Sequence, residues 1–228
     1  MKSKDKFTIK DNTVSSENQL PKDKFITYIG NADAKKRILI IGNSITRHDA
    51  KPEIGWHGDF GMAASAPEND YVHLLCGRIL EKEDACIMVH QLALWERSCT
   101  QKDALSLAKA ARDFAPDLLI FRLGENIPSP TEADGQQKME DAFSSLIDYI
   151  RPRKTVFTTC FWKHGVIDEA IRAVAKKKNA PLAELGDLGE DNRFMAIGLF
   201  EHNGVAHHPG DLGMKEIAER IYFAMQNL

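Results

Sequence analysis

A serine, an asparagine and a histidine stand far apart in this sequence, and each is placed where it could serve acyl transfer. Ser44 follows the β-branched run at 37–42 through a Gly-Asn turn, and His208 precedes Pro209 near the carboxyl terminus. A buried strand that stops at a small turn can expose a serine nucleophile, which then needs a histidine as its base. A serine hydrolase is therefore the leading hypothesis.

Asn126 supplies a third group for this chemistry, because it follows the strand run at 117–123. In a parallel sheet with a reversed strand order the first and third strands flank the switch point, so Asn126 would face Ser44. A neutral amide there can donate to the oxyanion, and such a donor is typically worth about 10²–10³ in rate. Taken alone, Ser44 could instead cap a helix and Asn126 could cap a loop.

The elements that must position these residues alternate along the chain. Five repeats of strand and helix predict a parallel sheet with helices on both faces, and ligands bind beyond the carboxyl ends of such strands. Trp162, His164 and Glu96 also follow strands and could line the pocket. The strand runs lie at 37–42, 86–92, 117–123, 154–160 and near 180–185, and the helical patterns at about 69–82, 101–114, 135–150, 166–178 and 212–226.

Length and composition indicate one domain of ordinary size. The chain has 228 residues, a formal net charge of −3 and 28% charged residues, which is typical of a soluble protein without a nucleic-acid partner. Residues 1–36 are predicted to form an extended arm that packs against a domain at 37–228. No apolar run suits a signal peptide or a membrane span, so we expect a cytoplasmic protein without a membrane partner, although a removed leader remains open. Four scattered cysteines indicate a reducing compartment.

Three short motifs, taken in order, resemble those of the SGNH/GDSL hydrolases. They are Gly42-Asn43-Ser44, Gly124-Glu125-Asn126 and His208-Pro209-Gly210-Asp211, and the resemblance extends from about 37 to 226. It implies that Ser44 is the nucleophile, that Ser44 and Asn126 form the oxyanion hole, and that His208 is the general base. It also implies a three-layer α/β/α sandwich with a five-stranded parallel, flavodoxin-like sheet. Ester or acyl substrates are implied, with neither a metal nor an organic cofactor.

Two departures from the family pattern concern the oxyanion side of the site. Asn43 stands where the family usually has an aspartate, which is a mild change because that side chain does not react. The family's glycine after the second strand is missing from 91–98. A backbone N–H from this segment could still donate to the oxyanion.

The third departure concerns the base. Val205 occupies the position, three residues before His208, where the family has its acid. An acid holds the productive tautomer of the histidine, so another group must do so here. Glu201, Asp211 or a backbone carbonyl could take this part. With His208 as the base, kcat/KM is expected to rise through a limb near the ordinary histidine pKa of about 6.5, moved by the surroundings of the ring.

The segment 52–65 is a candidate wall of the site. Trp56 and Phe60 could stack on a sugar face there, with Glu125 as a further substrate contact, or the aromatics could simply pin the loop to the domain. The favoured function is a serine esterase that cleaves small or carbohydrate-linked acyl esters, acetyl above all. The partner is then a small-molecule or carbohydrate ester, and the oligomeric state stays open.

Two other classes of function remain as alternatives. One is a non-catalytic glycan-binding module of the same fold, which the missing acid and glycine favour and the retained Ser44, Asn126 and His208 oppose. The other is a metal-dependent hydrolase, since potential ligands are dense near the carboxyl terminus. Those ligands are His202, His207, His208 and Asp211.

Overall fold

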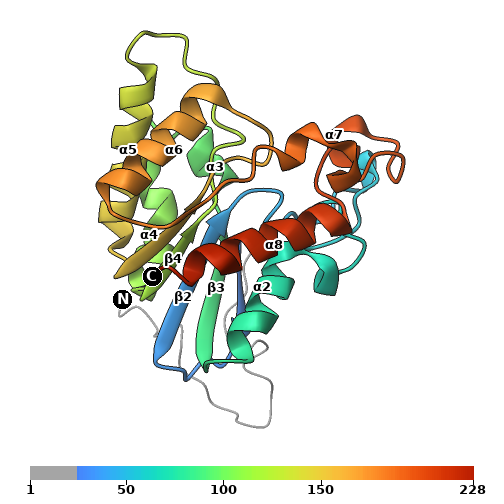
Figure 1. Cartoon of the computed structure of the whole chain (residues 1–228), viewed down its shortest axis with the longest axis horizontal. Helices are drawn as coiled ribbons and strands as arrows, with labels where there is room; N and C mark the ends of the chain where they lie inside the picture. Colours follow the sequence, from blue (N-terminus) through green and yellow to red (C-terminus); the bar gives the residue numbers. More distant parts are fainter. Residues whose placement is uncertain (1–24) are drawn as a thin grey trace, which may run out of the picture.

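The computed structural model describes residues 25–228 and shows a six-stranded sheet between two layers of helices (Figure 1). The strand order is β1-β3-β2-β4-β5-β6, and every neighbouring pair is parallel except β1 with β3. The predicted three-layer fold is confirmed, and its five parallel strands have the flavodoxin-like order. The strands are β1 (Ile26–Gly30), β2 (Lys36–Gly42), β3 (Ala85–Gln91), β4 (Leu118–Phe121), β5 (Lys154–Thr158) and β6 (Leu182–Ala183).

The additional strand, β1, comes from the segment that the sequence placed in an extended arm. It runs antiparallel to β3, with Ile26 opposite His90 and Gly30 opposite Cys86. Ile26 and Tyr28 are buried, as expected where alternate residues of an edge strand face the core. The prediction of five strands is therefore corrected to six. Residues 1–24 of the predicted arm lie outside the described residues.

Helices cover both faces of the sheet. In Figure 1, α2 (Tyr71–Leu80) and α8 (Asp211–Met225) lie on one side, with α4 (Lys109–Phe114), α5 (Gly135–Ile150) and α6 (Gly165–Lys177) on the other. There are also two short helices. Helix α3 (Ala93–Glu96) follows β3, and helix α7 (Asn203–Ala206) precedes α8. The helix predicted over 101–114 is divided between a 3₁₀ segment and α4. The 3₁₀ helices are Pro52–Ile54, Pro67–Asn69, Ala104–Ala108, Leu188–Glu190 and Asn192–Phe194.

Strand β2 joins two hydrophobic layers. Leu39 and Ile41 belong to the layer beneath α5 and α6, whereas Ile38 and Ile40 belong to the layer beneath α2 and α8. All four side chains are fully buried, which explains the uninterrupted apolar run of a strand that is covered on both faces. This central strand holds the turn that follows it in a fixed place. None of the described helices has the length and apolar character needed to span a bilayer.

Candidate active site

Ser44 lies in a tight turn directly after β2. The N–H groups of Thr46 and Arg47 both donate to the Asn43 carbonyl oxygen at 3.0 Å, and no helix begins here, so Ser44 is not a helix cap. Gly42 allows this turn, because a Cβ at that residue would lie 1.8 Å from the Thr46 Oγ1. The end of the central strand therefore presents the serine at the carboxyl edge of the sheet.

His208 reaches Ser44 from the loop between α7 and α8. Its Nε2 lies 2.8 Å from the Ser44 Oγ, and its Nδ1 lies 2.6 Å from the Gly204 carbonyl oxygen. A carbonyl oxygen only accepts, so Nδ1 carries the hydrogen and Nε2 accepts from the serine hydroxyl. The sequence left Glu201, Asp211 or a backbone carbonyl as the group that orients His208. In the structure this group is the backbone carbonyl of Gly204.

The position of the missing acid is part of a small core. Val205 is fully buried in a cluster with Trp56, Met62, Ala63 and Ala196. A carboxylate at this position would lose its hydration without gaining a polar partner from these apolar side chains. Val205, at the position where the family has an acid, therefore packs the loop that carries His208 against this cluster.

The environment of His208 favours the neutral imidazole. Burial lowers the pKa of His208 to about 4, although its hydrogen bond to the Gly204 carbonyl acts in the opposite direction. The surroundings of His208 therefore move the expected acid limb below 6.5. The Trp162 ring packs edge-on against the imidazole, with centroids 5.2 Å apart and an interplanar angle of 81°. Trp162 therefore helps to hold the His208 ring.

Asn126, which the sequence predicts as an oxyanion donor, is held by Glu96. Its Nδ2 donates to the Glu96 Oε2 at 2.6 Å, while the Glu96 Oε1 accepts from the Gly124 N–H at 2.6 Å and from the Asn43 Nδ2 at 3.0 Å. The Ser44 N–H has no acceptor among the described residues, so it is free to donate to an oxyanion. Burial raises the pKa of Glu96, and the nearby Glu125 raises it further.

Asn43 uses its whole amide group inside this network. Its Nδ2 donates to Glu96 at 3.0 Å and to Glu125 at 2.6 Å, and its Oδ1 accepts from Arg122 at 3.1 Å and from the Ile45 N–H at 3.2 Å. An aspartate could make neither donation and would add a third carboxylate. The departure from the family's Gly-Asp-Ser pattern thus follows from the two glutamates around it.

Glu125 is occupied by protein partners, and its contact with substrate stays a prediction. Its side chain is 4% exposed and pairs with the fully buried Arg122 at 2.5 Å. It also accepts from the Phe161 N–H at 3.0 Å. Sequence reasoning missed Arg122, whose only signal was a charged residue within the apolar run 117–123.

The segment 91–98, which lacks the family's glycine, contains the short helix α3. Trp95 is fully buried there and packs against Phe143, and the Leu92 N–H donates to the Gly42 carbonyl oxygen at 2.6 Å. Helix α3 ends on Glu96, which it directs into the site. The sequence predicted that Glu96 could line the pocket but gave no sign of its partners.

Trp56 is part of the core, so its prediction as a sugar platform is wrong. It is 3% exposed, donates from Nε1 to the His48 carbonyl oxygen at 3.0 Å, and meets the Phe60 ring edge-on at a centroid distance of 5.0 Å. This geometry agrees with the alternative prediction, in which the aromatic side chains pin the 52–65 loop to the domain. Phe60 is partly buried, and its contact with substrate stays a prediction.

The potential metal ligands near the carboxyl terminus do not converge. Asp211 accepts from the Ser65 N–H at 2.8 Å and from its Oγ at 2.6 Å, while the exposed His207 bonds the Asn203 carbonyl. Over residues 25–228 there is no group of three or more histidine, cysteine, aspartate or glutamate side chains placed to hold a metal ion. The bond to Ser65 instead fastens the loop after Ser44 to the start of α8.

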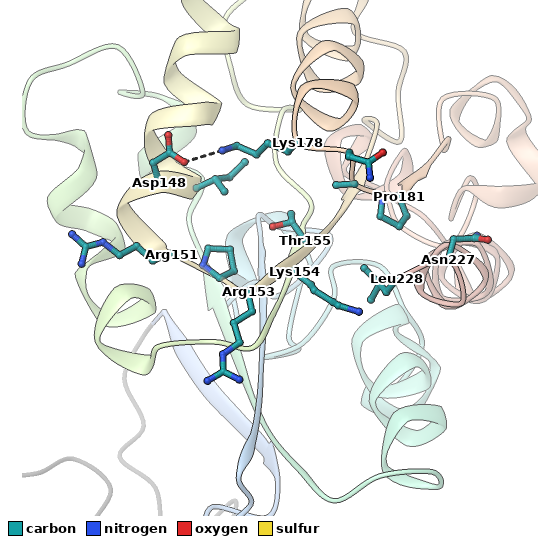
Figure 2. A pocket seen from close by; sticks show the side chains of 13 residues that line it. Asp148, Arg151, Arg153, Lys154, Thr155, Lys178, Pro181, Asn227 and Leu228 are labelled. Atoms are coloured by element: carbon teal, nitrogen blue, oxygen red, sulfur yellow. Dashed lines mark hydrogen bonds and ion pairs between the residues drawn. The ribbon is translucent and has the colours of Figure 1, made fainter.

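A separate cavity of about 460 Å³ lies at the other end of the sheet (Figure 2). Lys154, the first residue of β5, lines it, whereas Ser44 follows the last residue of the parallel strand β2. In Figure 2 the Lys178 side chain reaches Asp148, at 2.8 Å, while Arg151 and Arg153 point away from the cavity. This cavity therefore takes no part in the candidate active site.

The sequence matches no protein-family model and no curated protein. Solved structures with a similar fold include a lipase/acylhydrolase from Enterococcus faecalis, which is 15% identical with a TM-score of 0.58, over 84% of this chain and 96% of that one. A GDSL-like lipase from Bacteroides ovatus is 15% identical with a TM-score of 0.54, over 86% and 100%. A two-domain esterase active on acetylated mannans is 16% identical with a TM-score of 0.50, over 84% and 48%. The chain thus has the SGNH/GDSL hydrolase fold.

Proposed function

We propose that this protein is a serine esterase that cleaves acyl esters through an acyl-enzyme on Ser44. The observation that carries the proposal is the 2.8 Å separation between the Ser44 Oγ and the His208 Nε2. A serine and an acceptor nitrogen at this distance make the nucleophile and base pair of covalent acyl transfer. We assign the oxyanion hole to Asn126 and to the Ser44 N–H, which has no acceptor among the described residues.

The reaction follows from these positions. The Ser44 Oγ attacks the ester carbonyl carbon while its proton passes to the His208 Nε2, and the carbonyl oxygen takes the negative charge next to the Ser44 N–H and Asn126. The leaving alcohol then takes the proton from His208. Water attacks the acyl-enzyme with the same histidine as base, which releases the acid and restores Ser44.

The substrate class of this proposal is a small or carbohydrate-linked ester, with acetyl as the acyl group. Support comes from the two-domain esterase with the same fold, which is active on acetylated mannans. Trp56 no longer adds support, because it is buried. A comparison of acetyl and longer acyl esters of one sugar tests this finer part of the proposal, since a preference for longer chains would contradict it.

Covalent labelling with a fluorophosphonate probe tests the nucleophile and the base. We expect one adduct at Ser44, located by mass spectrometry, and no adduct in the S44A and H208A variants. Matched controls are S106A and H207A, because Ser106 and His207 are surface residues that bond only nearby backbone carbonyls. An unlabelled but folded wild-type protein would contradict the proposal and favour the glycan-binding alternative.

A further inference from the structure

The buried carboxylate of Glu96 accepts hydrogen bonds from the side-chain amides of both Asn126 and Asn43. We propose that Glu96 is a positioning residue that fixes the Asn126 amide, so that its second N–H faces the oxyanion formed at Ser44. This inference rests on the proposed esterase function. It assigns a part in the reaction to a residue that touches neither the substrate nor the nucleophile.

The chemistry of the two groups determines how the amide is turned. The Asn126 Nδ2 carries two N–H groups, and one of them donates to the Glu96 Oε2 at 2.6 Å. An ionised carboxylate only accepts, so it selects the NH₂ end of the amide over the carbonyl end. The other N–H then points in one direction only, which is the preorganisation that an oxyanion donor needs.

Glu96 also holds the loop that carries Asn126. Its Oε1 accepts from the Gly124 N–H at 2.6 Å, two residues before the asparagine, so one carboxylate fixes both the backbone and the side chain of this loop. A buried carboxylate is costly unless it is hydrogen-bonded, and here three donors satisfy it. These three hydrogen bonds lower the pKa of Glu96 and so act against burial and Glu125, which raise it.

The same carboxylate is joined to the nucleophile turn. The Asn43 Nδ2 donates to Glu96 at 3.0 Å, and the Asn43 Oδ1 accepts from the N–H of Ile45, the residue after Ser44, at 3.2 Å. Glu96 therefore ties the turn that bears the Ser44 N–H to the loop that bears Asn126. Arg122 and Glu125 also bond Asn43, but Glu96 is the one of these side chains that bonds the Asn126 amide as well.

A double-mutant cycle between Glu96 and Asn126 tests the inference. E96Q keeps the shape but replaces one acceptor oxygen with an NH₂ group. At Oε2 this group faces the Asn126 Nδ2, and at Oε1 it faces the Gly124 N–H and the Asn43 Nδ2, so in either case the hold on Asn126 or on its loop is weakened. We expect kcat on a p-nitrophenyl ester to fall between about 10-fold and the 10²–10³ of a removed oxyanion donor, with KM nearly unchanged. In the N126A background, E96Q should lower kcat by no more than about twofold, because the group through which it acts is gone.

The matched control is E125Q, which also alters a buried carboxylate of the network. Glu125 bonds Arg122, Asn43 and the Phe161 N–H but not Asn126. Its effect on kcat should therefore multiply with that of N126A within about twofold. Should E96Q fail to fold, E96D keeps the charge and withdraws the carboxylate by one methylene, and the same dependence on Asn126 is expected.

The outcomes separate this inference from the esterase proposal. If fluorophosphonate labels Ser44 and E96Q leaves kcat unchanged, or lowers it by the same factor with and without Asn126, the positioning role is wrong and the esterase stands. If the wild-type protein is not labelled and does not hydrolyse any ester, both the positioning role and the esterase proposal are wrong. If E96Q lowers kcat when Asn126 is present but not in the N126A background, the result supports the positioning role and the esterase proposal together.

Discussion

The Nδ1 atom of His208 lies 2.6 Å from the carbonyl oxygen of Gly204, so a peptide group of helix α7 orients the base. A carbonyl fixes the tautomer as a carboxylate would, because both accept the Nδ1 hydrogen. It carries no net charge, however, to stabilise the imidazolium that forms as the proton leaves the serine. We therefore expect a base that stays neutral to low pH and a slower acyl transfer than a complete triad gives.

The first prediction concerns the pH dependence of the reaction. Burial lowers the pKa of His208 to about 4, so the base is neutral and ready to accept a proton at any pH well above that value. We expect kcat/KM to rise through a limb near pH 4 and to be flat from about pH 5.5 to 8. Hydrolysis of a p-nitrophenyl ester across this range measures it. A limb near 6.5 would mean that the imidazole is solvated or paired with a carboxylate.

The second prediction links the same group to stability. Unfolding returns His208 to its ordinary pKa of about 6.5, above the folded value of about 4, so the unfolded chain binds the proton more readily between these limits. The contribution to stability is complete above pH 6.5 and is lost as the pH falls towards 4. Urea unfolding at pH 7 and pH 5 should show a larger loss for the wild type than for H208Q. Equal losses would contradict the burial of a neutral imidazole.

The third prediction concerns the position of the missing acid. Because Val205 is fully buried among apolar residues, V205D places a carboxylate without partners in the core and should destabilise the protein by more than about 3 kcal/mol. We expect no gain in kcat. V205T is the matched control, because it keeps the shape and adds only a hydroxyl. Thermal unfolding compares the two, and a stable V205D with raised kcat would show that the site can accept an acid.

Much of this fold could be predicted from the sequence. Five apolar runs alternated with helical patterns, and local periodicity of this length identifies elements well. The order of the strands then placed the ends of β2 and β4 side by side. Strand β1 was not predicted as a strand because its short apolar patch is paired with β3, about sixty residues away along the chain. Nothing local distinguishes an edge strand from a packed arm.

The candidate site could be predicted only in part. Ser44 and His208 stood out because their types and neighbours indicate chemistry, and the structure places them together. The network around Glu96 and Arg122 depends on which groups tertiary structure brings within hydrogen-bond distance, and a sequence does not show this. Trp56 was placed wrongly because a loop aromatic can equally well face solvent or a small core.

The fourth prediction concerns Asn43, whose amide satisfies two carboxylates at once. N43D removes both donations to Glu96 and Glu125 and adds a like charge between them, so we expect a loss of about 2–4 kcal/mol of stability and a lower kcat. N192D makes the same chemical change at an exposed residue and should shift stability by no more than about 0.5 kcal/mol. Chemical denaturation measures both. An unchanged N43D would mean that one of the two glutamates is protonated and donates in its place.

The fifth prediction separates packing from substrate binding at Trp56. Since this ring fills a small core with Phe60 and Val205, W56A should cost about 3–5 kcal/mol of stability, whereas W56F keeps an aromatic ring and should cost less. A buried ring has no face for a sugar. The ratio of kcat/KM for an acetylated sugar to that for p-nitrophenyl acetate should therefore be the same in W56F and the wild type. A selective loss on the sugar ester would show that the 52–65 loop opens to expose Trp56 when substrate binds.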